Sequence, residues 1–125
     1  MEVKNKVVIV TGAGSGIGKA AAIHFATHGA IVVVSDINFD SAKKVADQIV
    51  NNGGESLPVK TDVTKFQEVE DLVNKTISNY EKLDVIVNNA GIGPNLLPTH
   101  KARLEDWDRV IAVNQTGVFY CMKVA

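Results

Sequence analysis

Hydrophobic residues along the chain form short continuous runs that alternate with longer segments of helical period. The runs have the length of β-strands and cover Lys6 to Thr11, Ile31 to Ser35, Glu55 to Lys60 and Asp84 to Asn88. The segments between and after them carry apolar residues three and four positions apart, which predicts helices. Because each crossover must return the chain to the same end of the sheet, the alternation predicts a parallel sheet.

Four helices are expected, and their boundary signals differ. The first covers residues 19–28, and the second follows Asp40 and ends at Asn52-Gly53-Gly54, a left-handed cap signal. The third opens with Thr64 and Gln67 at the spacing of a capping box. Its expected buried residues are Phe66, Val69, Val73, Ile77 and Tyr80. The fourth starts near Arg103 and runs toward the end of the chain, with Gly117 as a weak point.

The fold class is therefore α/β, a doubly wound, Rossmann-like parallel sheet. Right-handed crossovers and the doubly wound order predict that the strands lie in the order 3-2-1-4. A ligand crevice is expected where this order reverses, between strands 1 and 4. That position brings the run Thr11 to Gly18 beside Asn88-Asn89-Ala90-Gly91. We expect residues 1–125 to form one dinucleotide-binding domain.

The run Thr11-Gly12-Ala13-Gly14-Ser15-Gly16-Ile17-Gly18 follows an apolar strand and precedes a helix. Glycines allow unusual backbone angles and let a diphosphate approach the main chain, while a helix N-terminus attracts the anion. The spacing is T-G-x-x-x-G-x-G rather than G-x-G-x-x-G, and Gly14 is an extra glycine in the variable part. A purely structural turn would rarely need so many glycines, since each costs up to about 1 kcal/mol inside a helix. The run predicts a phosphate-binding turn.

Asp36 ends the second expected strand, 24 positions after Gly12. An acidic residue near this distance binds the adenosine ribose of a dinucleotide, although a helix or turn cap is the alternative role. A carboxylate there repels a ribose 2′-phosphate by about 4 kcal/mol for charges roughly 4 Å apart. Neither Ser15 in the glycine run nor the adjacent Ile37 supplies a compensating positive charge. These residues favour NAD over NADP.

Asp62 and Val63 follow the third expected strand at the same end of the sheet. They could contact the adenine through a carboxylate acceptor and an apolar side chain. Asp62 also stands two residues before Thr64, so it could instead organise the turn. Both roles remain open from the sequence.

Composition points to small molecules and other protein chains as partners. The 13 basic and 14 acidic residues give a net charge of -1 without blocks of like charge, so neither nucleic acid nor an anionic membrane is favoured. No apolar run approaches the roughly 20 residues of a membrane helix. The single cysteine, Cys121, agrees with a reducing compartment and a buried position, and we expect a cytoplasmic protein. His24 and His28 lack an evident third ligand, so no metal site is expected.

Together the glycine run, Asp36, Asp62-Val63-Thr64 and Asn88-Asn89-Ala90-Gly91 resemble the short-chain dehydrogenase/reductase family, in order and over the whole chain. The resemblance implies that Asn88, Ala90 and Gly91 lie beside the cofactor ribose and nicotinamide, and that Asn89 steadies the sheet. It also implies that Asn114, within Val113 to Gly117, helps to hold a water in a proton relay. The candidate cofactor-binding residues are Gly12, Ser15, Gly16, Ile17, Gly18, Asp36, Ile37, Asp62, Val63, Asn88, Ala90 and Gly91, and the candidate catalytic residue is Asn114.

The family transfers hydride between a nicotinamide and an alcohol or carbonyl, using a serine and a Tyr-x-x-x-Lys pair expected after Asn114. Residues 115–125 contain no serine, and Tyr120 and Lys123 are three apart rather than four. We therefore expect the 125-residue chain alone to be inactive. The resemblance further implies a homo-oligomer, with Trp107 and Ile111 in helix packing or a subunit contact.

Two other functions are compatible with some of these residues. A non-catalytic nucleotide-binding or assembly module would use the same glycine run, but the fourth helix ends without a stop signal. A doubly wound methyltransferase would share the glycine turn and Asp36. It gives no reason for Asn88-Asn89-Ala90-Gly91 or for Asn114.

Overall fold

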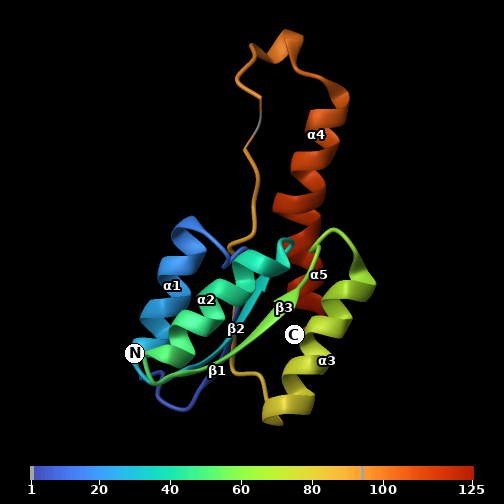
Figure 1. Ribbon diagram of the computed structural model, residues 1–125. Coiled ribbons are helices and arrows are strands. Elements are labelled where there is room, and N and C mark those ends of the chain that lie inside the picture. Colours follow the sequence, from blue (N-terminus) through green and yellow to red (C-terminus); the bar gives the residue numbers. More distant parts are fainter. Residues whose placement is uncertain (1, 94) are drawn as a thin grey trace.

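The computed structural model describes residues 2–93 and 95–125, and its centre is a four-stranded parallel sheet (Figure 1). The strands are β1 (Val7–Val10), β2 (Ile31–Asp36), β3 (Glu55–Lys60) and β4 (Val85–Val87). They lie in the order β3-β2-β1-β4, so the expected topology is confirmed. In the register, Val8 of β1 lies opposite Val32 of β2 on one side and Val85 of β4 on the other.

Helices cover both faces of this sheet. They are α1 (Gly16–Thr27), α2 (Phe39–Asn51), α3 (Phe66–Tyr80), α4 (Leu104–Ile111) and α5 (Gly117–Val124), with a 3₁₀ turn η1 (Thr99–Lys101) and a π-helical segment η2 (Ala112–Thr116). Helix α1 begins three residues earlier than the sequence predicts, so Gly16 and Gly18 belong to its first turn. Within the described ranges, no helix is long and apolar enough to cross a membrane.

Alternation along the strands divides the core into two layers. Val8 and Val10 pack with Val32 and Val34 against α1 and α2, through side chains such as Ala22 and Val45. Ile9 and Val33 point to the other face and pack with Leu72 and Val73 of α3 and with Val124 of α5. Because both faces are covered, β1 and β2 carry apolar residues at consecutive positions, as buried parallel strands do.

The start and the buried face of α3 differ from the sequence prediction. Its N-cap is Lys65, and the capping box is wrong because the Thr64 hydroxyl donates to Asp62 Oδ1 at 2.7 Å. Ile77 is 42% exposed, whereas Thr76 is fully buried. Thr76 tolerates burial because its hydroxyl donates to the Leu72 carbonyl at 2.9 Å.

The expected fourth helix is a continuous rod of three segments, α4, η2 and α5 (Figure 1). In the figure, α4 extends beyond the sheet. Gly117 is buried, and a Cβ there would lie 2.7 Å from Val63 Cγ2. This glycine therefore lets α5 approach the turn that follows β3 closely.

Asp84 ties the beginning of β1 to the segment before β4. Its Oδ2 accepts from the Val7 N–H at 2.8 Å and forms an ion pair with Lys82 Nζ at 3.0 Å. The Val7 hydrogen bond and then the hydrogen bond from Lys82 lower the pKa of this carboxyl below its ordinary value. This contact lies at the end of the sheet opposite the candidate site.

Candidate functional site

A crevice of about 590 Å³ lies at the carboxyl ends of the strands, between the segments that follow β1 and β4. Its position is the point where the strand order reverses, as predicted. The expected residues that line it are Gly12, Ser15, Gly16, Ile17, Asp36, Ile37, Asp62, Val63, Ala90 and Gly91. Gly18 and Asn88, which were also expected here, do not line it. The lining also contains residues that the sequence analysis did not name as cofactor-binding, which are Thr61, Asn89, Ile92 and Val113.

The turn after β1 leaves the first N–H groups of α1 available to a ligand. Gly12 and Gly16 adopt φ of 63° and 57°, in the left-handed region that favours glycine. The N-cap residue Ser15 makes no side-chain cap hydrogen bond, and the first turn of α1 has no acidic residue. Ser15, Gly16 and Ile17 line the crevice. Unpaired N–H groups at a helix N-terminus form a suitable site for a diphosphate.

Gly12 and Gly18 are required because backbone segments pack closely beneath the turn. A Cβ on Gly12 would lie 2.8 Å from the Ala90 Cα. A Cβ on Gly18 would overlap the Gly12 carbonyl oxygen and the Asn89 side-chain amide. Gly18 therefore supports the turn from inside rather than lining the crevice.

Thr11 and Asn89 bind the two walls of the crevice to each other. Thr11 Oγ1 accepts from the backbone N–H of Asn89 at 3.1 Å and from that of Ala90 at 3.0 Å. The Asn89 side-chain amide donates to the carbonyls of Thr11 at 3.1 Å and Gly12 at 3.2 Å. These bonds fix the segment after β4 against the glycine turn.

Asp36 stands at the end of β2, with its carboxylate toward the glycine turn. Oδ2 accepts from the Gly14 N–H at 2.9 Å, and Oδ1 accepts from the Asn38 N–H at 2.9 Å. Ile17 and Ile37, which also line the crevice, are 83% and 61% exposed. The arrangement places a carboxylate and two apolar side chains in the lining of the crevice.

Asp62 has a structural contact as well as a place in the crevice. Its Oδ1 accepts from both the N–H and the hydroxyl of Thr64, at 3.0 and 2.7 Å, so it organises the turn before α3. Val63 is buried between the crevice and α5. The two roles left open by the sequence are therefore compatible.

The π-helical segment η2 presents Asn114 to the segment that follows β4. Asn114 Nδ2 donates to the Ile92 carbonyl at 2.9 Å, and Asn114 Oδ1 accepts from the Ile92 N–H at 2.9 Å. This pair of bonds holds the backbone next to Gly91. Nearby along the chain, the side-chain oxygen of Asn88 is buried without a hydrogen-bond partner.

Other side chains considered from the sequence have structural contacts. Tyr120 packs edge to face on Phe66, with ring centroids 5.2 Å apart, and does not line the crevice. Burial raises the pKa of the Cys121 thiol to about 11, so the thiol stays protonated at neutral pH. His24 and His28 lie on the exposed side of α1, with their ring centroids 4.4 Å apart and the ring planes tilted by 53°. In residues 2–93 and 95–125, no group of three acidic, histidine or cysteine side chains could hold a metal.

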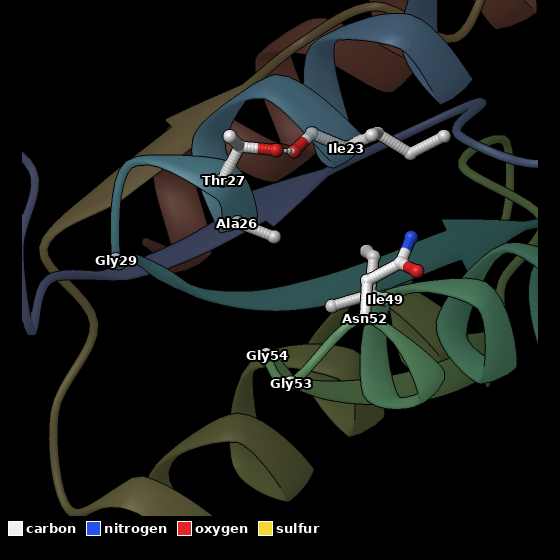
Figure 2. Close-up of a pocket in the computed structure, with 8 residues that line it drawn as sticks. All are labelled: Ile23, Ala26, Thr27, Gly29, Ile49, Asn52, Gly53 and Gly54. Atoms are coloured by element: carbon white, nitrogen blue, oxygen red, sulfur yellow. Dashed lines mark hydrogen bonds between the residues drawn. The ribbon is translucent and has the colours of Figure 1, made fainter.

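A second hollow, of about 450 Å³, lies between the ends of α1 and α2 (Figure 2). The described residues that line it are Ile23, Ala26, Thr27, Gly29, Ile49, Asn52, Gly53 and Gly54, and none is ionisable. The Thr27 hydroxyl is already bonded to the Ile23 carbonyl at 2.9 Å. This hollow therefore offers a ligand fewer polar groups than the crevice at the strand ends does.

Sequence reasoning missed three of the residues that line the crevice, for two reasons. Thr61 and Ile92 follow strands β3 and β4 directly or closely, so the rule that ligands bind at strand carboxyl ends could have found them. Val113 lies in the π-helical segment. The sequence contains no signal for a π-helix there, so the direction of this side chain could not be predicted. Asn89 was expected to steady the sheet, and its side chain does bind the turn after β1.

Comparison with known proteins shows which family has this combination of fold and glycine turn. The family model described as short chain dehydrogenase matches residues 6–125. The chain belongs to this family. Cyclohexanol dehydrogenase from an Acinetobacter species is 43% identical over 118 residues, which are 94% of this chain and 47% of the relative. The 3-oxoacyl-[acyl-carrier-protein] reductase of a Synechocystis species is 43% identical over 122 residues, which are 94% of this chain and 48% of the relative.

Solved structures of the short-chain dehydrogenase family superimpose closely on the chain. A family member from Burkholderia phymatum, in complex with NAD, gives a TM-score of 0.94 at 31% identity, over 99% of this chain and 44% of that one. The 3-ketoacyl-(acyl-carrier-protein) reductase of Brucella melitensis, complexed with NADH, gives 0.92 at 37% identity, over 97% and 48%. The chain thus spans about half the length of the relatives it matches.

Proposed function

We propose that the chain forms the cofactor-binding part of a nicotinamide-dependent oxidoreductase that interconverts an alcohol and a carbonyl compound. The observation that carries the proposal is the glycine turn bonded to the segment after β4 at the point where the strand order reverses. Family membership and relatives in complex with NAD and NADH support it. We further propose that residues 1–125 act as one dinucleotide-binding domain.

The residues present fit such a cofactor. The free N–H groups at the start of α1 would hold the diphosphate, and Asp36 would bind the adenosine ribose. Val63 and Ile37 would contact the adenine, while Ala90 and Gly91 would face the ribose and nicotinamide. A bound nicotinamide dinucleotide supplies the acceptor or donor of the hydride. The chain's own contribution is to bind and orient it.

Asn114 has a well-defined positioning role in this proposal. Its two hydrogen bonds to Ile92 fix the wall of the crevice next to Gly91. π-Helical turns often occur at functional sites, which supports a functional use of this one. The catalytic role implied for Asn114, holding a water in a proton relay, stays a prediction.

Asp36 is expected to select NAD over NADP, and its substitution tests the proposed function. In Asp36→Ser, the lost bond to the ribose should weaken NADH binding by about 10- to 100-fold, the range for a hydrogen bond to a charged group. NADPH binding should improve relative to NADH, because the repulsion of the 2′-phosphate is removed. Isothermal titration calorimetry with both cofactors measures the two dissociation constants.

Asp40→Ser provides a matched control, since Asp40 lies in the first turn of α2 and does not line the crevice. Its NADH-to-NADPH preference should equal that of the unmodified chain. Failure of the unmodified chain to bind either cofactor would contradict the proposed function. An unchanged preference in Asp36→Ser would contradict the selection of NAD.

We also propose that the protein assembles as a homo-oligomer through the rod of α4 and α5. Leu104 and Trp107 on α4, and Phe119 and Met122 on α5, are large apolar side chains that remain exposed. Light scattering after size-exclusion chromatography should give a mass above that of one chain, and Leu104→Lys should lower it. A monomer at every protein concentration would contradict the assembly.

A further inference from the structure

The Asp36 carboxylate is held from two sides by backbone N–H groups. The Gly14 N–H, from the glycine turn, is 2.9 Å from Oδ2. The Asn38 N–H, at the N-cap of α2, is 2.9 Å from Oδ1. Each oxygen therefore has one fixed donor, and the orientation of the carboxylate is set before any ligand arrives.

This arrangement leaves some acceptor positions of the Asp36 carboxylate free for a ligand. An ionised carboxylate offers about four acceptor positions, and the backbone uses two of them. The remaining positions can accept ribose hydroxyls only in the orientation that Gly14 and Asn38 impose. A hydrogen bond to a charged group changes affinity by about 10- to 100-fold, so a rotated carboxylate would lose much of its preference for a ligand that carries the ribose hydroxyl.

Gly14 must be glycine because of the space around it, not because of its backbone angle. Gly12 and Gly16 have positive φ, whereas Gly14 does not. A Cβ on Gly14 would lie 2.8 Å from Asp36 Oδ2 and 2.7 Å from the Ser41 Cβ of α2. The space between the turn, Asp36 and α2, rather than the backbone angle, excludes a side chain here.

We propose that Gly14 is a positioning residue for cofactor recognition, acting through Asp36 on the adenosine 2′-hydroxyl. Its N–H orients the carboxylate, and its missing Cβ lets the turn approach closely enough to do so. A side chain at this position would rotate the carboxylate away from the ribose. The proposal rests on the proposed function, since it assumes that a nicotinamide dinucleotide occupies the crevice.

The test compares NADH with its analogue that lacks the adenosine 2′-hydroxyl, by isothermal titration calorimetry. The unmodified chain should prefer NADH. In Gly14→Ala, affinity for NADH should fall by about tenfold, while affinity for the analogue should change by less than about twofold. Gly93→Ala is the matched control, because a Cβ there meets no atom within 4 Å and Gly93 does not line the crevice.

A second variant covers the case in which Gly14→Ala disturbs α2. Combining it with Ser41→Gly removes the contact between the two Cβ atoms and leaves only the contact with Asp36. The preference for the 2′-hydroxyl should still be lost in this double variant, relative to Ser41→Gly alone. Circular dichroism verifies that each variant is folded.

The possible outcomes separate the two proposals. An equal loss of affinity for NADH and the analogue, or no loss in either background, would overturn the role of Gly14. A chain that binds both molecules equally well before any substitution would also overturn it. Absence of NADH binding by the unmodified chain would instead remove the proposed function itself.

Discussion

Thr11→Val should lower the free energy of unfolding by about 2 kcal/mol, although it changes neither size nor shape appreciably. Thr11 is 1% exposed, and its hydroxyl is the acceptor for the N–H groups of Asn89 and Ala90. The Asn89 N–H keeps a second acceptor, the Val87 carbonyl at 3.0 Å, so the main cost falls on the Ala90 N–H. Urea denaturation followed by circular dichroism measures the difference.

Thr76→Val is the matched control for this prediction. Thr76 is also fully buried, but its hydroxyl only donates to the Leu72 carbonyl of its own helix. Removing that hydroxyl leaves no N–H group without a partner, so the loss should be below about 1 kcal/mol. Equal losses at the two positions would show that the Thr11 hydroxyl does not have the bridging role described above.

Gly18→Ala should weaken NADH binding by roughly 30-fold, which corresponds to about 2 kcal/mol. The added methyl group would overlap the Gly12 carbonyl and the Asn89 amide, so the glycine turn must move away from the segment after β4. Inserting a methyl group into a filled space also destabilises a fold by about 1 to 3 kcal/mol. Calorimetric titration with NADH and urea denaturation measure the two effects.

A glycine-to-alanine substitution at Gly93, where the added methyl group meets no other atom, is the control for Gly18→Ala. Gly93→Ala should leave both the dissociation constant and the unfolding free energy unchanged within error, because its Cβ meets no atom within 4 Å. If Gly18→Ala bound NADH as well as Gly93→Ala does, the close packing beneath the turn would have no importance for binding.

The sheet could be predicted from the sequence because β1 and β2 are buried on both faces. Val7 to Val10 form a continuous apolar run with a glycine turn at its end, and this combination has few alternatives. The strand order then followed from general rules of handedness and connection. Local periodicity was sufficient for this part of the fold.

The errors in α3 arose where a threonine hydroxyl forms a hydrogen bond with a neighbouring residue. Thr64 has the residue type and spacing of an N-cap residue, but its hydroxyl donates to Asp62 instead of capping the helix. The N-cap is therefore Lys65, one residue after the predicted position. Thr76 replaces Ile77 on the buried face of α3, because a hydroxyl bonded within its own helix can be buried at little cost. A pattern of apolar and polar positions cannot represent either effect.

Most residues that line the candidate site could be predicted from the sequence, but the hydrogen bonds between them could not. Glycine spacing and strand ends indicated which residues surround the crevice. Nothing in the spacing showed that the Gly14 N–H binds Asp36, because this contact depends on how closely the turn approaches β2 and α2. The π-helical segment that brings Asn114 to Ile92 could not be predicted from the sequence either.

The projecting position of α4 has a spectroscopic consequence. Trp107, the single tryptophan of the chain, is 66% exposed and lies outside both core layers. Its indole is already largely hydrated in the folded chain, so unfolding of the sheet changes its surroundings little. Contact with a second copy along α4 would remove it from water. Tryptophan emission would therefore report on the proposed association of the rods rather than on formation of the sheet.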